Sequence, residues 1–149
     1  MKDTIFNLTD DEILHHHIHV DNARSLIQAQ LGLGAEEDGT LSGYYGGFYL
    51  IVGFSHLHPL MVFSFCRPFT SKATVNTYRA LNRANISSIL GSHSLNLDVG
   101  CYCFRATHWL FEDLSSIQLQ RFMDRCMADA QKGYCALLSK KYGKLEVKS

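Results

Sequence analysis

Several features that mark particular protein classes are absent from this sequence of 149 residues, or scarce in it. No apolar run approaches the ~20 residues that a membrane-spanning helix needs, and Met1-Lys2-Asp3-Thr4 lacks the apolar segment of a signal peptide. The two prolines, Pro59 and Pro68, both lie at the limits of predicted strands. Because no long linker or low-complexity stretch interrupts the chain, we expect a single domain over residues 1–149 and no membrane partner.

Neither sign of charge is in excess, since 14 Lys and Arg residues balance 14 Asp and Glu residues. A nucleic-acid-binding domain is expected to carry a basic stripe that releases counterions. The densest basic run is Lys140, Lys141 and Lys144, at the C-terminal end of a predicted helix, where the helix dipole stabilises cations. We therefore expect no nucleic-acid partner.

The chain has no Cys-x-x-Cys pair, and its five cysteines are Cys66, Cys101, Cys103, Cys126 and Cys135. Each lies in an apolar stretch of predicted strand or helix, which is typical of reduced thiols and not of a disulfide framework. We therefore expect the protein in the cytoplasm. Cys101 and Cys103 share one face of a strand with Arg105, whose charge favours a reactive thiolate, although inert buried thiols are the simpler interpretation.

Catalytic signatures are also missing: there is no GxSxG, P-loop, GxGxxG or paired-carboxylate arrangement. The glycines of residues 43–47 join two predicted strands and open no helix, so they lack the amide cradle of a phosphate site. A histidine cluster comprises His15, His16, His17 and His19, without the glutamate or third ligand of a zinc site. We expect no enzyme activity, metal or cofactor, and the alternative is a ligand- or metal-sensing role for these histidines.

Capping residues and apolar spacing predict three helices. The first covers residues 9–31 and begins with a Thr-x-x-Glu capping box, the second lies between about 70 and 91, and the third covers 115–142. One face of the second helix is expected to be buried: Val75, Tyr78, Leu81 or Asn82, Asn85, Ile86 and Ile89. The amides of Asn82 and Asn85 are expected to bond to neighbouring backbone groups.

Period-two alternation predicts five strands in two groups, residues 40–44, 48–55 and 60–67, then 94–98 and 101–110. The separators are short, so the first group is a meander and the second a hairpin. With the helices interleaved, the order is α-βββ-α-ββ-α. This order predicts an α+β fold in which helices pack on an antiparallel sheet.

The predicted strands carry apolar residues on both faces, whereas a sheet with one wet face alternates between apolar and polar residues. Because monomers seldom expose so large an apolar surface, we predict a protein partner or a homodimer on the second face. The simpler alternative is that the first helix covers it. If the helices cover Leu50, Val52, Tyr102 and Phe104, the partner-binding residues are Tyr49, Ile51, Met61, Phe63, Phe65 and Trp109.

A family resemblance is carried mainly by residues 78–142. It comprises Leu81-Asn82-Arg83-x-Asn85, Leu95-Asn96-Leu97-Asp98-x-Gly100-x-x-x-Phe104-Arg105, and Leu114-Ser115 before a long helix. These segments resemble the YbjN family of bacterial sensory transduction regulators, which is similar in fold to type III secretion chaperones. The resemblance implies a homodimer that binds a protein partner as a chaperone-like or regulatory adaptor and has no catalytic residues.

Overall fold

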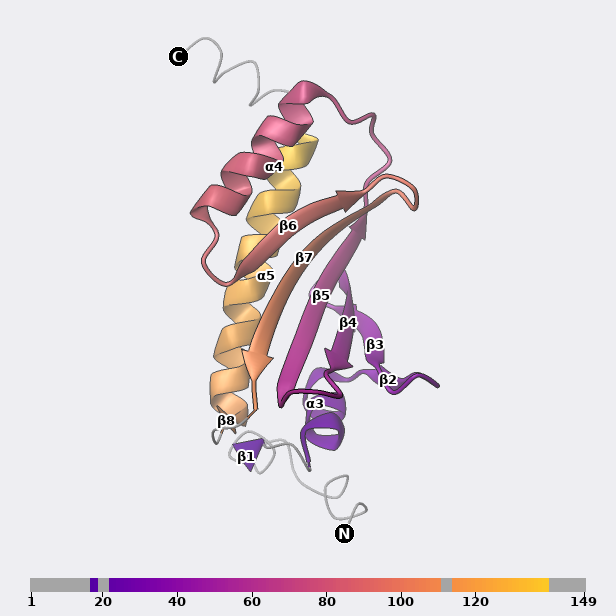
Figure 1. The fold of residues 1–149 in the computed structure, drawn as a ribbon, viewed down its shortest axis with the longest axis vertical. Coiled ribbons are helices and arrows are strands. Elements are labelled where there is room, and N and C mark those ends of the chain that lie inside the picture. The colour runs from indigo at the N-terminus through magenta and orange to yellow at the C-terminus, as the bar shows by residue number, and fades with distance from the viewer. Residues whose placement is uncertain (1–16, 19–21, 111–113, 140–149) are drawn as a thin grey trace.

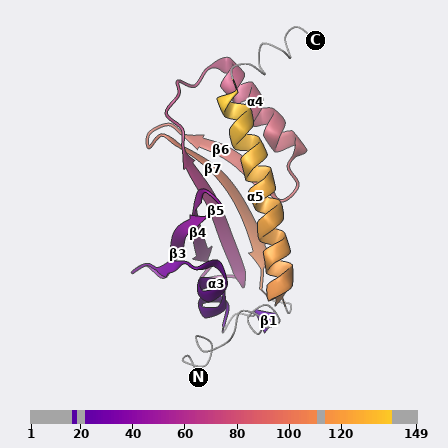
Figure 2. The same cartoon turned by 180° about the vertical axis from the view of Figure 1, so that it is seen from behind.

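The computed structural model of the chain describes residues 17–18, 22–110 and 114–139. A twisted antiparallel sheet lies in front of a long helix in Figure 1, and the same helix lies in front of the sheet in the reversed view of Figure 2. The main sheet has six strands. The described elements therefore form two layers, with the long helix against one face of the sheet and a shorter helix beside one of its edges.

The main sheet consists of β2 (Gly34–Ala35), β3 (Leu41–Tyr45), β4 (Phe48–Phe54), β5 (Leu60–Pro68), β6 (Gly91–Asn96) and β7 (Cys101–Trp109). These strands lie side by side in the order β2-β3-β4-β5-β7-β6. The helices are α3 (Ala23–Leu31), α4 (Val75–Ser87) and α5 (Ser116–Leu138). A second, two-stranded sheet pairs β1 (His17–Ile18) with β8 (Leu114–Ser115). The predicted α+β class, meander and hairpin are confirmed.

The first helix begins much later than predicted. Residues 17–18 are paired as a strand, and the helix starts only at Ala23, so the prediction of one continuous helix over 9–31 is wrong. Helix propensity is a weak preference, and backbone pairing with Leu114 and Ser115 overrides it here. The capping box at 9–12 and the histidines at 15, 16 and 19 lie outside the described residues.

The two later helices begin at capping boxes. Thr74 accepts a hydrogen bond from the backbone N–H of Thr77, and Ser115 accepts one from that of Gln118. Each cap satisfies donors that the first helical turn leaves unpaired. The start of α5 is as predicted, while α4 begins a few residues after the predicted start at about residue 70.

The turn between β3 and β4 determines how these strands pair. Gly46 and Gly47 both have positive φ, of 59° and 83°, and they connect the directly opposite residues Tyr45 and Phe48. Two left-handed residues in a two-residue hairpin make a type I′ turn, whose twist matches that of the strands. Glycine adopts this geometry without the strain that a Cβ atom introduces.

The core lies between the sheet and the helices and is organised in cross-strand rows. Val52, Phe63 and Ala106 lie directly opposite one another on β4, β5 and β7, and all three are buried. Helix α5 packs on this face through a stripe with a spacing of three and four residues: Leu119, Met123, Cys126, Ala130, Gly133 and Leu137. Helix α3 adds Leu26, Ile27 and Leu31 to the same core.

Three of the predicted partner-binding residues belong to this core. Met61, Phe63 and Phe65 are fully buried, and the register of β5 with β4 places them on the same face as Leu50 and Val52. The prediction that they lie on the opposite face is wrong. A difference of one residue in register exchanges the two faces of a strand, and the β4–β5 connection is too long to fix the register by itself.

A buried polar contact joins β6 to α5. The Nδ1 atom of His93 is 2.6 Å from the hydroxyl of Tyr102, and that hydroxyl donates to the carbonyl oxygen of Ala130 at 3.2 Å. The hydroxyl has one proton to donate, so Nδ1 of the neutral ring carries its own proton and Nε2 is an acceptor. No partner for Nε2 exists among the described residues. A Cβ at Gly133 would lie 2.3 Å from Nδ1, so only glycine fits beside the ring.

The backbone of His93 is held by α4. The side-chain amide of Asn85 donates to the carbonyl oxygen of His93 at 3.0 Å and accepts from its N–H at 2.6 Å. The prediction that Asn85 bonds to neighbouring backbone is confirmed, whereas Asn82 is exposed.

Phe63→Ala is expected to lower the free energy of unfolding by about 3–5 kcal/mol, because it removes a buried ring from the centre of the core. Val62→Ala, one residue away on the opposite face, should cost less than about 1.5 kcal/mol. Chemical denaturation of both variants measures the difference. Equal losses would contradict the assignment of faces.

The stability of the protein should fall as the pH drops below 6.5. Burial lowers the pKa of His93 below that value, against an opposing effect of Asp129, so the unfolded chain binds the proton more readily than the folded one. Between pH 7.5 and 5 the melting temperature should fall with pH, and the slope of this fall should be reduced in His93→Gln. The exposed His58→Gln is the matched control and should keep the slope; an unchanged slope in His93→Gln would exclude His93 as its origin.

Candidate partner-binding surface

The second face of the sheet is not covered by any helix among the residues that the structure describes, and it faces the viewer in Figure 1. We call it the open face. It includes Tyr44, Tyr49, Ile51, Val62, Ser64, Cys66, Ser92, Ser94, Cys101, Cys103, Arg105, Thr107 and Trp109. The described part of the first helix packs on the core face, so it does not cover this surface.

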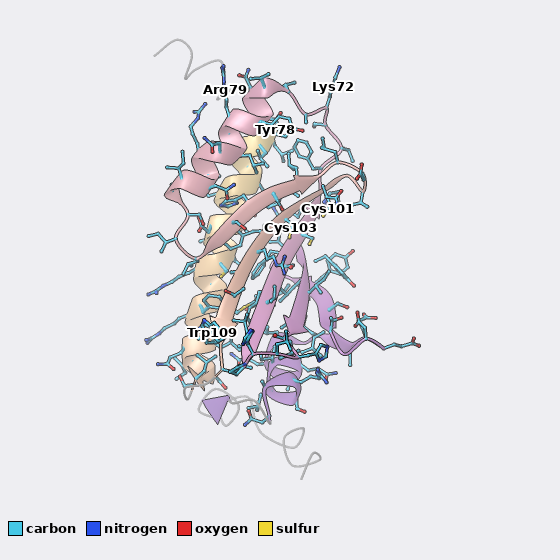
Figure 3. The ribbon with its side chains drawn as sticks, in the orientation of Figure 1. Lys72, Tyr78, Arg79, Cys101, Cys103 and Trp109 are labelled. Carbon is cyan, nitrogen blue, oxygen red and sulfur yellow. The ribbon has the colours of Figure 1, made fainter. Side chains whose placement is uncertain are left out.

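Three of the six predicted partner-binding residues lie on the open face: Tyr49, Ile51 and Trp109. The exposed fraction is 39% for Tyr49 and 47% for Trp109, and Ile51 is half-buried. Trp109 lies near one end of β7, with its ring in edge contact with that of His58 at 6.1 Å between centroids. Figure 3 shows Cys101 and Cys103 nearer the other end of the same strand. The open face thus combines aromatic, aliphatic and thiol groups.

Local contacts hold the tyrosines of the open face in place. The rings of Tyr44 and Tyr49 meet edge to face, with 5.4 Å between their centroids. The hydroxyl of Tyr49 donates to the Ser42 hydroxyl at 3.1 Å, and Ser42 donates in turn to the carboxylate of Glu36. Fixed aromatic rings lose little conformational entropy on binding, so this pair is suited to a contact surface.

Three thiols gather on the open face, toward one end of β5 and β7. Cys66 on β5 lies directly opposite Cys103 on β7, and Cys101 is two residues from Cys103 on the same side. A hydrogen bond from Cys66, with further contributions from Ser64 and Arg105, lowers the pKa of Cys103 to about 7, although burial opposes the shift. The same contact raises the pKa of Cys66, which therefore stays protonated as the donor. Cys66 has no sequence signal that links it to Cys103, because 36 residues separate the two.

Helix α4 carries a second exposed apolar surface. The face predicted to be buried is turned outward, since Ile86 and Ile89 are 76% and 95% exposed and Val75 and Tyr78 are at least half exposed. We call these four residues the α4 stripe, although Ile89 lies two residues beyond the end of the helix at Ser87. The helix packs inward instead through buried Thr77 and through Ala80 and Leu81 against the core, and of these only Leu81 belongs to the predicted face. The helical period was predicted correctly, but the side of the helix that faces the core was not.

No group of three or more His, Cys, Asp and Glu side chains is arranged to hold a metal ion in the described ranges. The side chains of the histidines at 15–17 and 19 are not among those described, and His56 and His58 are exposed beside the β4–β5 turn. None of the described helices is both long and apolar enough to cross a bilayer.

Comparison with known proteins agrees with this geometry. A family model named YbjN, described as "Putative bacterial sensory transduction regulator", matches residues 23–138. The chain belongs to the YbjN family. Among curated proteins no sequence match was found.

Solved structures resemble the fold at low sequence identity. YbjN from E. coli matches with a TM-score of 0.56 and 12% identity over 77% of this chain and 87% of that one. A chain of the HopA1–SchA chaperone–effector complex matches with 0.53 and 13% over 71% and 85%. The Yersinia pestis type III secretion chaperone SycH, solved with a fragment of YscM2, matches with 0.51 and 14% over 83% and 98%. The YbjN family member therefore has a secretion-chaperone-like fold.

Proposed function

We propose that this YbjN family member is a non-enzymatic interaction module, a chaperone-like or regulatory adaptor that binds a segment of a protein partner on its open face. The observation that carries the proposal is the partial exposure of Tyr49, Ile51 and Trp109 on a sheet face without a covering helix among the described elements. The similar fold of SycH, solved with a fragment of YscM2, and of a chain in the HopA1–SchA complex supports this role.

The energetics of the surface favour a protein segment over a small molecule. The apolar residues are spread over β4, β5 and β7, so an extended chain can contact several of them at once. Burying each large apolar side chain contributes roughly 1.5–3 kcal/mol, and aromatic anchors often dominate such interfaces. Partly exposed Arg105, Ser92 and Ser94 beside them supply the polar contacts that give an interface its specificity.

The cytoplasm is the proposed location. All five cysteines are free, and three of them lie close together on one face without forming a disulfide. Free thiols so arranged are typical of a reducing compartment.

A photo-crosslinking amino acid at Tyr49, introduced into the full chain in its native host, should give a discrete adduct with one protein partner. The adduct should disappear in Ile51→Glu, which places a charge in the middle of the contact surface without changing the core. Circular dichroism would verify that the variant is folded.

The matched control places the same crosslinker at Lys132, which is exposed on α5, away from the open face. The same adducts at both positions, or an adduct that survives Ile51→Glu, would contradict binding at the open face. An adduct consisting only of a second copy would assign the open face to self-association instead.

The homodimer is a second part of the proposal, and the α4 stripe is the surface that supports it. Helix α4 lies at the edge of the molecule beside β6 in Figure 1, and the four residues of the stripe are exposed. One apolar helix face can pack on an identical copy about a twofold axis. The formal net charge of zero leaves no overall electrostatic repulsion between two copies.

Sedimentation equilibrium at micromolar concentration is expected to show a dimer for the unmodified chain and a monomer for Ile86→Glu. Ile51→Glu is the control, and it should remain dimeric because its side chain lies on the open face. A monomer in the unmodified chain would exclude the homodimer, and a monomer only in Ile51→Glu would move the interface to the sheet.

A further inference from the structure

The backbone hydrogen bonds of β5, β6 and β7 determine how the three cysteines of the open face are placed relative to one another. In an antiparallel strand the N–H and C=O of one residue point to the same side, and those of the next residue point to the other. Both groups of His93 bond to Asn85, outside the sheet, so the groups of Ser94 face β7. Ser94 lies opposite Cys103, and its hydroxyl donates to the carbonyl oxygen of Cys103 at 3.4 Å.

The backbone groups of Cys103 therefore point toward β6, away from β5. An independent contact agrees, because the N–H of Phe69 donates to the carbonyl oxygen of Gly100 at 2.7 Å. The backbone groups of residues 69 and 67 thus face β7, and those of Cys66 face β4. Cys66 and Cys103 are consequently a directly opposite pair without backbone hydrogen bonds between them.

Such a pair has the spacing of a disulfide. Opposite residues without backbone hydrogen bonds have Cα atoms about 4.5 Å apart and the closest side chains in the sheet, and disulfides form at Cα separations of about 4.4–6.8 Å. Cys101 is less well placed, since it lies diagonally from Cys66, at about 7–8 Å, and two residues from Cys103, at about 6.8 Å. Cys126 is buried in the core and Cys135 is exposed on α5.

We propose that Cys103 and Cys66 form a peroxide-reactive dithiol that closes to a disulfide between β5 and β7 on the open face. Cys103 is the attacking thiol, because the Cys66 and Ser64 hydrogen bonds and the Arg105 charge all favour its thiolate. Cys66 is the resolving thiol. Both are partly exposed, so a small oxidant reaches them.

The reaction has two balanced steps. The Cys103 thiolate attacks one oxygen of hydrogen peroxide, the O–O bond breaks, and the products are a sulfenic acid on Cys103 and hydroxide. The sulfur of Cys66 then attacks the sulfur of Cys103. The S–S bond forms, the S–O bond breaks, and the Cys66 proton leaves with the hydroxyl group as water. Two electrons pass from the two thiols to peroxide, and a thiol reductant reverses the change.

The test uses the reduced full chain, treated with hydrogen peroxide and then with a maleimide that blocks the remaining thiols. Mass spectrometry of the digest should find one disulfide that joins Cys66 to Cys103, with Cys135 blocked as a free thiol. Chymotryptic cleavage after Tyr102 separates Cys101 from Cys103, so the linked residue is identified directly. The disulfide should form in the unmodified chain and disappear on reduction.

Two variants separate the roles of the thiols. Cys66→Ala should abolish the disulfide and let a dimedone adduct of the sulfenic acid accumulate on Cys103. Cys101→Ala is the matched control, on the same strand and face, and should still form the disulfide. A Cys66–Cys101 link, or peroxide that leaves both residues as free thiols, would overturn the proposal. The experiment on the unmodified chain needs no partner, so its result is independent of the proposed function.

Discussion

The register between β4, β5 and β7 is the constraint on which the rest of this structure depends. Side chains alternate along a strand, so the pairing of Val52, Phe63 and Ala106 on one face determines which residues of all three strands fill the core. The same register places Tyr49, Cys66 and Cys103 side by side on the open face. The core and the candidate surface are thus two results of one pairing pattern.

The two faces are governed by different physical requirements. On the core face the requirement is shape, as shown by Gly133, where a single Cβ atom would collide with the His93 ring. On the open face many side chains are partly exposed, so their polarity and reactivity matter more than their exact shape. A partner surface and a thiol pair can therefore coexist with a close-packed core on the other face of the same sheet.

The order of elements follows from local signals in the sequence, whereas the faces do not. The capping box at Ser115, the glycine pair at 46–47 and the period-two strands each act over a few residues, and each led to a correct prediction. The burial of Phe63 depends on a register across a longer turn, and the outward side of Ile86 depends on how α4 packs on its neighbours. Both depend on tertiary packing, which the periodicity of the sequence does not determine. The Cys66–Cys103 pair is equally non-local, so only the fold brings it together. Of the predicted partner-binding residues, Tyr49, Ile51 and Trp109 lie on the surface because their strands did alternate as expected.

The contact between Asn85 and His93 has a consequence for how this molecule associates with others. β6 is the last strand on its side of the sheet, and a last strand normally offers unpaired peptide groups to which another chain can add. The amide of Asn85 presents one donor and one acceptor to His93, as the peptide group of a neighbouring strand would. It thereby occupies the hydrogen-bonding site that a neighbouring strand would use at the middle of this sheet edge. Strand addition and sheet-to-sheet aggregation are blocked there, so a partner that binds the sheet near β6 contacts its broad surface and does not extend this edge.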